Sequence, residues 1–209
     1  MATRQASERI RAAAVQLWAE RGFHGSGIRD LAQAAELSSA TLYHYMGTKE
    51  DLLAEIMSDS MTRLITAASQ VTDSPGSHSQ RLSALVQLHV LAHAVRPQET
   101  RVVDGELRGL TAAHLASVLA LRDRYEAIWQ SVIDAGCAAG EFTVTSRSVA
   151  RLALLQMCSG VALWYSPDGP LSLADLALRH AEMALSMLNA KSPVEDVVAE
   201  CRALLADWP

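Results

Sequence analysis

The sequence predicts an all-α protein, and three observations support that prediction. Apolar residues recur at three- and four-residue spacing over long stretches, which is the periodicity of amphipathic helices. Only six prolines interrupt the 209 residues, and no segment shows the strict alternation of apolar and polar residues that marks a half-buried strand. Hydrophobic residues make up 50% of the chain and charged residues 20%, as in globular proteins that bury a sizeable core.

The helices expected in the first half of the chain are bounded by cap and stop signals. Gly22 ends the first helix, whose apolar face includes Leu17 and Trp18. Thr48, followed by Asp51 three residues later, is typical of the N-cap of a helix. The later helices are expected at 28–35, 39–45, Lys49 to about Val71, and 80–95, with a Pro/Gly/Ser-rich turn at 72–79.

The second half of the chain continues the same pattern. Ser192 and Glu195 form a capping box with Pro193 at the first helical position, which predicts a tenth helix whose apolar positions extend to Trp208. Before it we expect a short segment at 98–110 and helices over 112–139, 146–165 and 172–189.

The cysteines and the N-terminal segment exclude several protein classes. Three cysteines, none in a CxxC spacing, argue against a secreted disulfide framework and against a structural zinc site. The N-terminal segment mixes arginine with glutamate and lacks the apolar core of a secretory leader. The most apolar stretch, 151–165, falls short of the roughly 20 apolar residues that a membrane span requires. We therefore expect a cytoplasmic protein with no membrane segment, metal or cofactor.

Residues 23–52 have the spacing of a helix-turn-helix unit, because two short helices are joined by a turn too tight for antiparallel packing. In the second short helix Leu37, Leu42 and Tyr45 are expected to point inward. The opposite side offers small residues with hydroxyl, phenol and imidazole groups, which suit a helix that enters the major groove. Lys49 and the helix N-terminus beside it suit a phosphate. The predicted DNA-binding residues are Ser26, Gly27, Ser38, Ser39, Ala40, Thr41, Tyr43, His44 and Lys49.

Four short segments in this region, in fixed order and spacing, resemble the TetR family of bacterial transcriptional repressors. They are AERGF at 19–23, IRDLA at 28–32, TLYHY at 41–45 and TKEDL at 48–52. The resemblance implies a three-helix DNA-binding domain at 1–48 and a helical ligand-binding and dimerisation bundle at 49–209. It further implies a homodimer that binds palindromic operator DNA and is released by a small-molecule effector.

Two positions depart from the family pattern. Gly27 stands where the family usually has a threonine N-cap, a replacement that costs only a few tenths of a kcal/mol. Glu36 stands where the turn usually has glycine, so a left-handed backbone there is expected to cost roughly 1 kcal/mol. Neither change removes a group that faces the DNA.

Two other classes of function are alternatives to DNA binding. A purely structural or ligand-binding helical protein is favoured by the small charge margin of residues 1–50, which carry six Lys/Arg against five acids. The rest of the chain is acidic, with twelve Lys/Arg against eighteen acids, so the positive bias lies at the N-terminal end. An enzyme is disfavoured because the sequence has no GxSxG, P-loop, dinucleotide fingerprint or HExxH motif.

Segments of the larger domain resemble the branch of the family that responds to acyl-CoA or steroid-CoA thioesters. They are ELR at 106–108, LRDRY at 121–125, GEF at 140–142 and WYSPDGP at 164–170. Leu163 departs from that branch, some members of which have an arginine there. The resemblance implies an acyl-CoA or related thioester as the effector. The alternative is a repressor of a drug-efflux gene that responds to aromatic or cationic drugs.

The expected effector site consists of aromatic, apolar and a few polar side chains. Arg122 lies on the apolar stripe of its helix, where it either meets a ligand anion or pairs with Glu126. His89 and His93 are four residues apart, but no third ligand lies near them in sequence, so we expect helix histidines and no metal. The predicted pocket residues are Met61, Leu85, His89, Glu106, Arg122, Tyr125, Trp129, Met157 and Trp164, although such residues also form ordinary core.

The helices expected at 146–165 and 172–189 carry more apolar surface than one side of a fold can bury. Closed two-fold pairing is the commonest way to cover such a surface. We therefore expect a four-helix dimer interface that contains Leu152, Leu155, Leu176, Met183, Ala184 and Met187.

Overall fold

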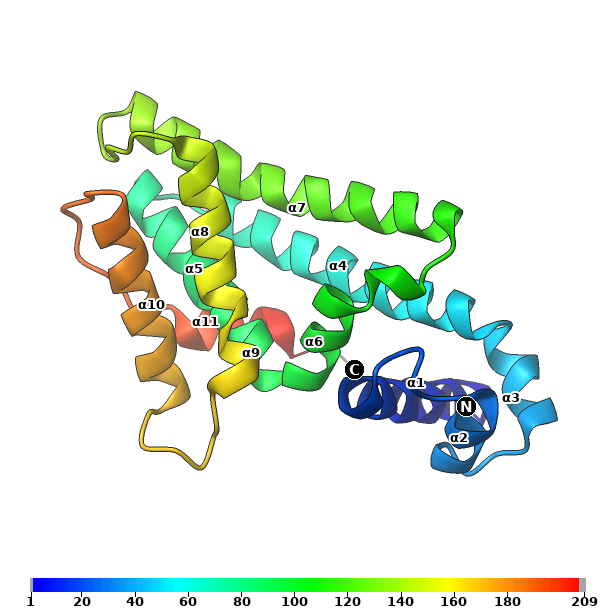
Figure 1. Cartoon of the computed structure of the whole chain (residues 1–209). Helices are drawn as coiled ribbons and strands as arrows, with labels where there is room; N and C mark the ends of the chain where they lie inside the picture. Colours follow the sequence, from blue (N-terminus) through cyan, green and yellow to red (C-terminus); the bar gives the residue numbers. More distant parts are fainter. Residues whose placement is uncertain (1, 207–209) are drawn as a thin grey trace. The chain divides into compact units, whose positions relative to one another are not determined.

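A computed structural model describes the backbone of residues 2–206 and the side chains of residues 5–206, and it confirms the all-α fold (Figure 1). No strand occurs in this part of the chain. The α-helices are α1 (Ala2–Arg21), α2 (Ile28–Ala34), α3 (Ser39–Met46), α4 (Lys49–Asp73), α5 (His78–Val95), α6 (Pro97–Gly105), α7 (Ala112–Ala138), α8 (Arg147–Ser159), α9 (Val161–Trp164), α10 (Leu173–Met187) and α11 (Val198–Leu205); a 3-10 turn, η1, covers Leu107–Gly109.

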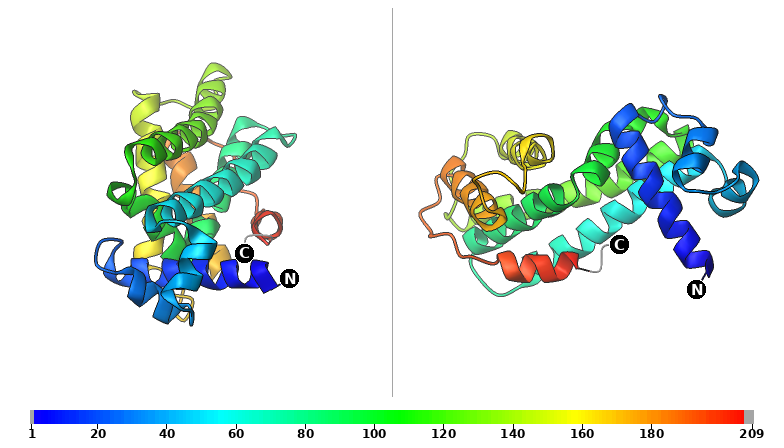
Figure 2. Two further views of the ribbon diagram at one scale, coloured as in Figure 1. Left: turned by 90° about the vertical axis from the view of Figure 1, so that its right-hand side faces the viewer. Right: turned by 90° about the horizontal axis from the view of Figure 1, so that it is seen from below.

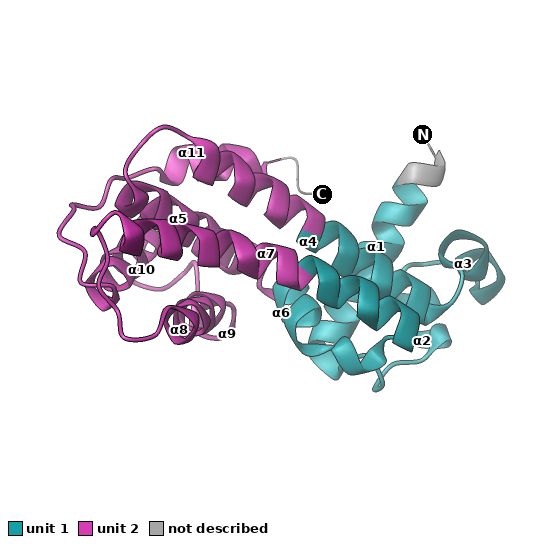
Figure 3. Ribbon diagram, turned by 90° about the horizontal axis from the view of Figure 1, so that it is seen from above, with its two compact units in different colours: residues 1–61, 98–121, 209 teal, residues 62–97, 122–208 magenta. Residues whose placement is uncertain are grey.

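The chain forms two compact units, shown in two colours in Figure 3. Of the described residues, unit 1 comprises 2–61 and 98–121, and unit 2 comprises 62–97 and 122–206. Helices α4 and α7 therefore each contribute residues to both units. The two units are defined by which residues contact one another. The boundary expected after residue 48 separates a DNA-binding domain from a ligand-binding domain, and it stays a prediction.

Unit 1 contains the helix-turn-helix and is built around a small aromatic centre. Trp18 at the end of α1 meets Phe23 edge-on, with ring centroids 5.2 Å apart. Leu31 of α2, Leu42 of α3 and Leu53 of α4 are fully buried in the same unit. Helices α1, α2 and α3 pack against one another, as the three-helix prediction requires.

Unit 2 is organised around α5, which is buried over almost its whole length. A helix that is buried on all sides is an interior helix, so its neighbours must surround it. Helices α8, α9, α10 and α11 all pack against it, and Figure 2 shows α11, in red, beside it.

The last helix begins later than the sequence predicts. The expected capping box of Ser192 and Glu195 does not form, and α11 starts at Val198. Buried Gln87 explains this difference, because its amide donates to the backbone oxygen of Glu195 at 2.8 Å and accepts from the N–H of Val197 at 3.1 Å. These bonds hold 195–197 against α5 in a non-helical form. Trp208 lies outside the described residues.

The helix expected at 146–165 is divided at Gly160 into α8 and α9. The segment at 98–110 is α6 followed by η1. The other boundaries agree with the prediction to within two residues at most ends, and Thr48 and Asp51 form the expected reciprocal cap: each backbone N–H donates to the other's side-chain oxygen, at 3.0 and 3.1 Å.

Candidate DNA-binding face and effector site

Helix α3 presents the polar face that the sequence predicts. Ser38 caps its N-terminus by accepting a bond from the N–H of Thr41 at 3.1 Å, and the two hydroxyls lie 2.8 Å apart. Leu42 and Met46 are buried, whereas Tyr43 and His44 are exposed. The side chains of Ser39 and Thr41 are partly exposed, and Ala40 is exposed. The first turn of α3 and its Tyr43 face are therefore accessible to a nucleic acid.

The turn before α3 has the left-handed residue that the sequence predicts. Glu36 has φ of 56°, a conformation that favours glycine. The turn is closed by the N–H of Leu37, which donates to the backbone oxygen of Ala32 at 2.9 Å. The unit therefore keeps the turn geometry of a helix-turn-helix in spite of the glutamate.

We expect Glu36→Gly to raise the free energy of unfolding by roughly 1 kcal/mol, because glycine adopts positive φ without the Cβ penalty. Urea denaturation measures this change. Asn189→Gly, at the other non-glycine residue with positive φ (53°) in the described chain, should give a smaller gain, since asparagine tolerates this conformation better. A loss of stability in Glu36→Gly would contradict the strain assigned to this turn.

Helix α2 begins at Gly27, which has no side chain to cap it. Instead the carboxylate of Asp30 accepts the N–H of Gly27 at 2.7 Å, so half of a capping box remains. Gly27 itself is exposed, as a backbone contact to DNA would require. Ser26, predicted as a DNA-binding residue, is buried, and its hydroxyl donates to the backbone oxygen of Phe23 at 3.4 Å.

Lys49 has a structural role that the sequence did not indicate. Its ammonium donates to the backbone oxygen of Phe23 and, at 2.6 Å, to that of Ser26, and it lies 4.0 Å from the centre of the Phe23 ring. Burial lowers the pKa of Lys49, and the charges of Glu50, Glu106 and Asp30 act in the opposite direction. Lys49 thus ties the start of α4 to the loop before α2, and two of its three N–H donors serve this purpose.

Arg11 of α1 is a second connection that sequence reasoning missed. Its guanidinium pairs with Asp59 of α4 at 3.1 Å and with Glu99 of α6 at 2.9 Å, and Glu99 is buried. These partners lie 48 and 88 residues away along the chain, so no local sequence pattern predicts them. These two ion pairs of Arg11 connect α1 to α4 and α6 within unit 1.

In unit 2, five polar and aromatic side chains form what we call the His89 cluster: His89, His93, Tyr125, Trp129 and Ser159. The ring nitrogens of His89 lie 2.8 Å from the Tyr125 hydroxyl and 2.9 Å from the Ser159 hydroxyl. His93 stacks on His89 with centroids 4.1 Å apart, and Trp129 meets His89 edge-on. The indole N–H of Trp129 is buried and has no hydrogen-bond partner in the described chain.

Burial moves the pKa of His89 well below its ordinary value of 6.5, and the neighbouring His93 moves it in the same direction. The imidazole is therefore neutral at physiological pH. One of its ring nitrogens donates and the other accepts, because a neutral imidazole has a single N–H.

We expect the free energy of unfolding to fall as the pH drops below about 6.5. In that range His89 is protonated in the unfolded chain but stays neutral in the folded protein, because its pKa is lowered there. The slope should reach up to about 1.4 kcal/mol per pH unit for this residue. Burial also lowers the pKa of His180, which adds to the effect. Urea denaturation from pH 7.5 down to about 5 measures it. His89→Gln should flatten the profile, and an unchanged slope in that variant would contradict the assignment.

The nine predicted pocket residues do not form one group. His89, Tyr125 and Trp129 belong to the His89 cluster, and Leu85 is fully buried in α5. Met61 and Glu106 belong to unit 1. Trp164 is exposed and stacks on His180. Arg122 and Met157 are half-buried.

Glu126, which the sequence offered as a partner for Arg122, pairs with Arg151 of α8 instead. The two charged groups lie 2.9 Å apart, and Arg151 also donates to the side-chain oxygen of Gln130 at 3.3 Å. The i,i+4 spacing within α7 is therefore overridden by a neighbouring helix.

Two of the three cysteines, Cys158 and Cys201, are buried core residues. Burial raises the pKa of Cys201 to about 12, and the pKa of Cys158 is raised further. In the described part of the chain no group of three or more His, Cys, Asp or Glu side chains is placed to hold a metal ion. None of the helices described is long and apolar enough to cross a bilayer.

Comparison with known proteins agrees with this architecture. The family described as "Bacterial regulatory proteins, tetR family" matches residues 10–56, and "Tetracyclin repressor-like, C-terminal domain" matches residues 75–188. The transcriptional repressor KstR2 of Rhodococcus jostii is 27% identical over 177 residues, which cover 84% of this chain and 87% of that protein.

Two solved structures share this fold. A regulatory protein of the tetR family from Rhodococcus RHA1 is 28% identical with a TM-score of 0.83, covering 90% of this chain and 98% of that one. AibR in complex with isovaleryl coenzyme A and operator DNA is 24% identical with a TM-score of 0.76, covering 88% and 97%. Since the C-terminal match alone spans more than half of the 209 residues and the N-terminal match covers the helix-turn-helix, the chain belongs to the TetR family of bacterial transcriptional regulators.

Proposed function

We propose that this protein is a dimeric, effector-controlled repressor that binds palindromic operator DNA through α3. The observation that carries the proposal is the polarity of α3: Leu42 and Met46 hold the helix in unit 1 while Tyr43 and His44 face outward. A phenol and an imidazole reach phosphates and base edges, and the small Ala40 lets the backbone approach the groove. The ordered N-terminus of α3 adds N–H groups suited to a phosphate.

Operator binding is tested by fluorescence anisotropy with a palindrome from upstream of the protein's own gene. We expect Tyr43→Ala to weaken binding by roughly tenfold, because one charge-assisted phosphate contact per half-site is lost. Tyr43→Phe removes only the hydroxyl group, so it distinguishes the contribution of the hydroxyl to binding from that of the ring. Equal affinity in Tyr43→Ala and wild type would contradict docking through this face.

The dimer proposal rests on an apolar surface of α8, α9 and α10, which we call the α8–α10 face. Helices α8 and α10 pack on α5 and on each other. Their exposed apolar side chains, with those of α9, are Val149, Leu152, Leu163, Trp164, Met183 and Met187. Leu176 and Ala184, which the sequence assigned to the interface, are fully buried inside the protomer against their own core, so they do not belong to it.

For the effector we propose a small amphipathic molecule, most specifically an acyl-CoA or related thioester, bound at the His89 cluster. The Trp129 N–H, buried and without a partner among the described residues, is a donor available to a ligand that brings a hydrogen-bond acceptor. A thioester or pantetheine carbonyl oxygen is such an acceptor. The similarity to AibR, solved with isovaleryl coenzyme A, supports the same class.

Release of the DNA requires that the effector favour a different arrangement of the recognition helices, because a ligand with equal affinity for both states shifts nothing. Helix α4 is the proposed lever. Its 25 residues run without a break from Lys49, next to α3, to Asp73 in unit 2. A coupling of 1 to 3 kcal/mol is typical, or roughly 5- to 150-fold in operator affinity.

The effector is tested by titrating CoA thioesters, free fatty acids and planar cationic drugs into the protein–operator complex. We expect release by at least one thioester, and a weaker response in Trp129→Phe, which removes only the N–H. Trp18→Phe is the matched control, because Trp18 has an equally buried and unpaired N–H in unit 1. Release by the drugs and by no thioester would refute the thioester proposal and leave operator binding intact.

A further inference from the structure

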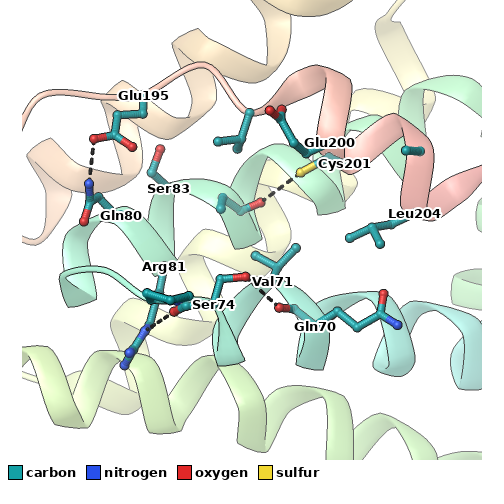
Figure 4. A pocket seen from close by; sticks show the side chains of 14 residues that line it. Gln70, Val71, Ser74, Gln80, Arg81, Ser83, Glu195, Glu200, Cys201 and Leu204 are labelled. Atoms are coloured by element: carbon teal, nitrogen blue, oxygen red, sulfur yellow. Dashed lines mark hydrogen bonds between the residues drawn. The ribbon is translucent and has the colours of Figure 1, made fainter.

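A groove of about 500 Å³ lies in unit 2 between the end of α4, the start of α5 and the C-terminal helix α11 (Figure 4). It is separate from the His89 cluster, because none of the cluster's five residues lines it. Helix α11 also lies beyond residues 75–188, where the family match ends. The groove is therefore a feature that the family domain alone does not supply. Its volume falls within the range of small-molecule sites.

The floor of the groove is apolar. Val71 of α4, Ala84 of α5 and Leu204 of α11 line it, and in Figure 4 Val71 and Leu204 point toward each other across it. Cys201 closes it, with its thiol directed at the backbone oxygen of Ala84 at 3.7 Å. Because burial raises the pKa of this thiol to about 12, Cys201 contributes apolar surface and no negative charge. The floor suits a hydrocarbon or aryl group.

The charged residues around the groove are unbalanced toward acids. Among the described residues that line it, Glu195 and Glu200 are the acids and Arg81 is the cation. The guanidinium of Arg81 donates from Nε to the backbone oxygen of Ser74 at 3.2 Å, and Figure 4 shows it directed away from Cys201 and Leu204. Glu195 accepts a bond from the Gln80 amide at 2.6 Å. The exposed Glu200 carboxylate has no partner among the described residues and stands one residue from Cys201.

We propose that this groove is a second small-molecule site that binds an amphipathic amine. The apolar body of the ligand packs on Val71 and Leu204, and its ammonium group pairs with Glu200. An anionic amphiphile is disfavoured at the same place by the two carboxylates. The site goes beyond the proposed function, because it is separate from the effector site and takes a ligand of opposite charge.

Isothermal titration calorimetry of the full-length protein with octylamine, octanol and octanoate tests this proposal at neutral pH. The three probes share one chain and differ in head group. We expect octylamine to bind most tightly and octanoate least. Glu200→Gln should weaken octylamine by about two- to fivefold, the range that an exposed ion pair supports, and should leave octanol unchanged.

The location is tested with two tryptophan substitutions on α11. Ala203→Trp places a bulky ring at the edge of the groove and should abolish octylamine binding. Ala199→Trp, at an exposed alanine of the same helix that does not line the groove, should leave it unchanged. Octylamine binding that survives Ala203→Trp, or octanoate binding as tight as octylamine, would overturn the proposal.

Operator affinity and thioester release, measured in the same variants, keep this proposal distinct from the proposed function. Both should be unchanged in Glu200→Gln, because α3 belongs to unit 1 and none of the five residues of the His89 cluster lines the groove that contains Glu200. If the wild type binds operator and responds to a thioester but takes no octylamine, only the groove proposal fails. If the wild type binds octylamine more tightly than Glu200→Gln does, but binds no operator, only the repressor proposal fails.

Discussion

Leu152→Glu is expected to convert the protein from a dimer to a monomer at micromolar concentration and to lower operator affinity at least 100-fold. Leu152 lies on the α8–α10 face with 48% of its surface exposed in the protomer. In the proposed two-fold dimer the new carboxylate stands in the interface twice, and burial of an unpaired charge costs several kcal/mol. A monomer offers one helix-turn-helix to a palindrome, so it loses the gain from simultaneous binding to both half-sites.

Sedimentation velocity measures the dimer, and anisotropy measures operator affinity. Leu119→Glu is the matched control, because Leu119 is 41% exposed but belongs to unit 1. It should remain dimeric. If Leu152→Glu dimerises as tightly as the control, the α8–α10 face is not the interface.

Lys49→Met is expected to destabilise the protein by about 3 kcal/mol and to weaken operator binding at least tenfold. The substitution removes the ammonium that binds the backbone oxygens of Phe23 and Ser26, and hydrogen bonds from a charged donor contribute about 1.5–3 kcal/mol each. The loop before α2 then loses its tie to α4. Chemical denaturation and anisotropy measure the two effects.

Lys191→Met provides the control, since Lys191 is the other lysine of the chain and is exposed. It should match the wild type in both assays. Full stability and full operator affinity in Lys49→Met would show that the bonds of Lys49 to the loop contribute nothing to the DNA-binding unit.

The local features of the fold were predictable because their causes lie within a few residues. The reciprocal cap of Thr48 and Asp51 follows from short-range spacing, whereas the left-handed Glu36 was expected from the resemblance to the family pattern. Of the residues expected to point inward from the recognition segment, Leu42 is buried, and Leu37 and Tyr45 are half-buried. The amphipathic periodicity also gave most helix ends correctly. The order of the four short motifs within residues 19–52 is enough to indicate the family, without any knowledge of contacts between helices.

The features that could not be predicted depend on partners far along the chain. Gln87 holds 195–197 from a distance of more than a hundred residues and thereby prevents the helix that Ser192 and Glu195 favour locally. Glu126 likewise pairs with Arg151 of the neighbouring helix α8, although Arg122 lies four residues before it on α7. Residue type and helical spacing alone gave no means to know this.

The site predictions divide along the same line. The predicted DNA-binding residues of α3 and its N-cap all come from one short helical segment, so one helical periodicity assigns them. Ser38, Ala40, Tyr43 and His44 are exposed in the structure, and Ser39 and Thr41 are partly exposed. The pocket residues were chosen by type from several helices, and the chain distributes them between two units and the surface. Leu176 and Ala184 were assigned to an interface because an apolar residue on a helix does not reveal which neighbour covers it.

Photocrosslinking from position 43 tests most directly whether α3 contacts the operator. A benzoyl-phenylalanine replaces Tyr43 in one protein and Val95 in another, two side chains that are each 53% exposed. With operator bound, the account predicts a covalent protein–DNA adduct from position 43 that maps within a half-site, and none from position 95. Bound operator that yields no adduct from position 43 would contradict the central claim that α3 lies in the groove.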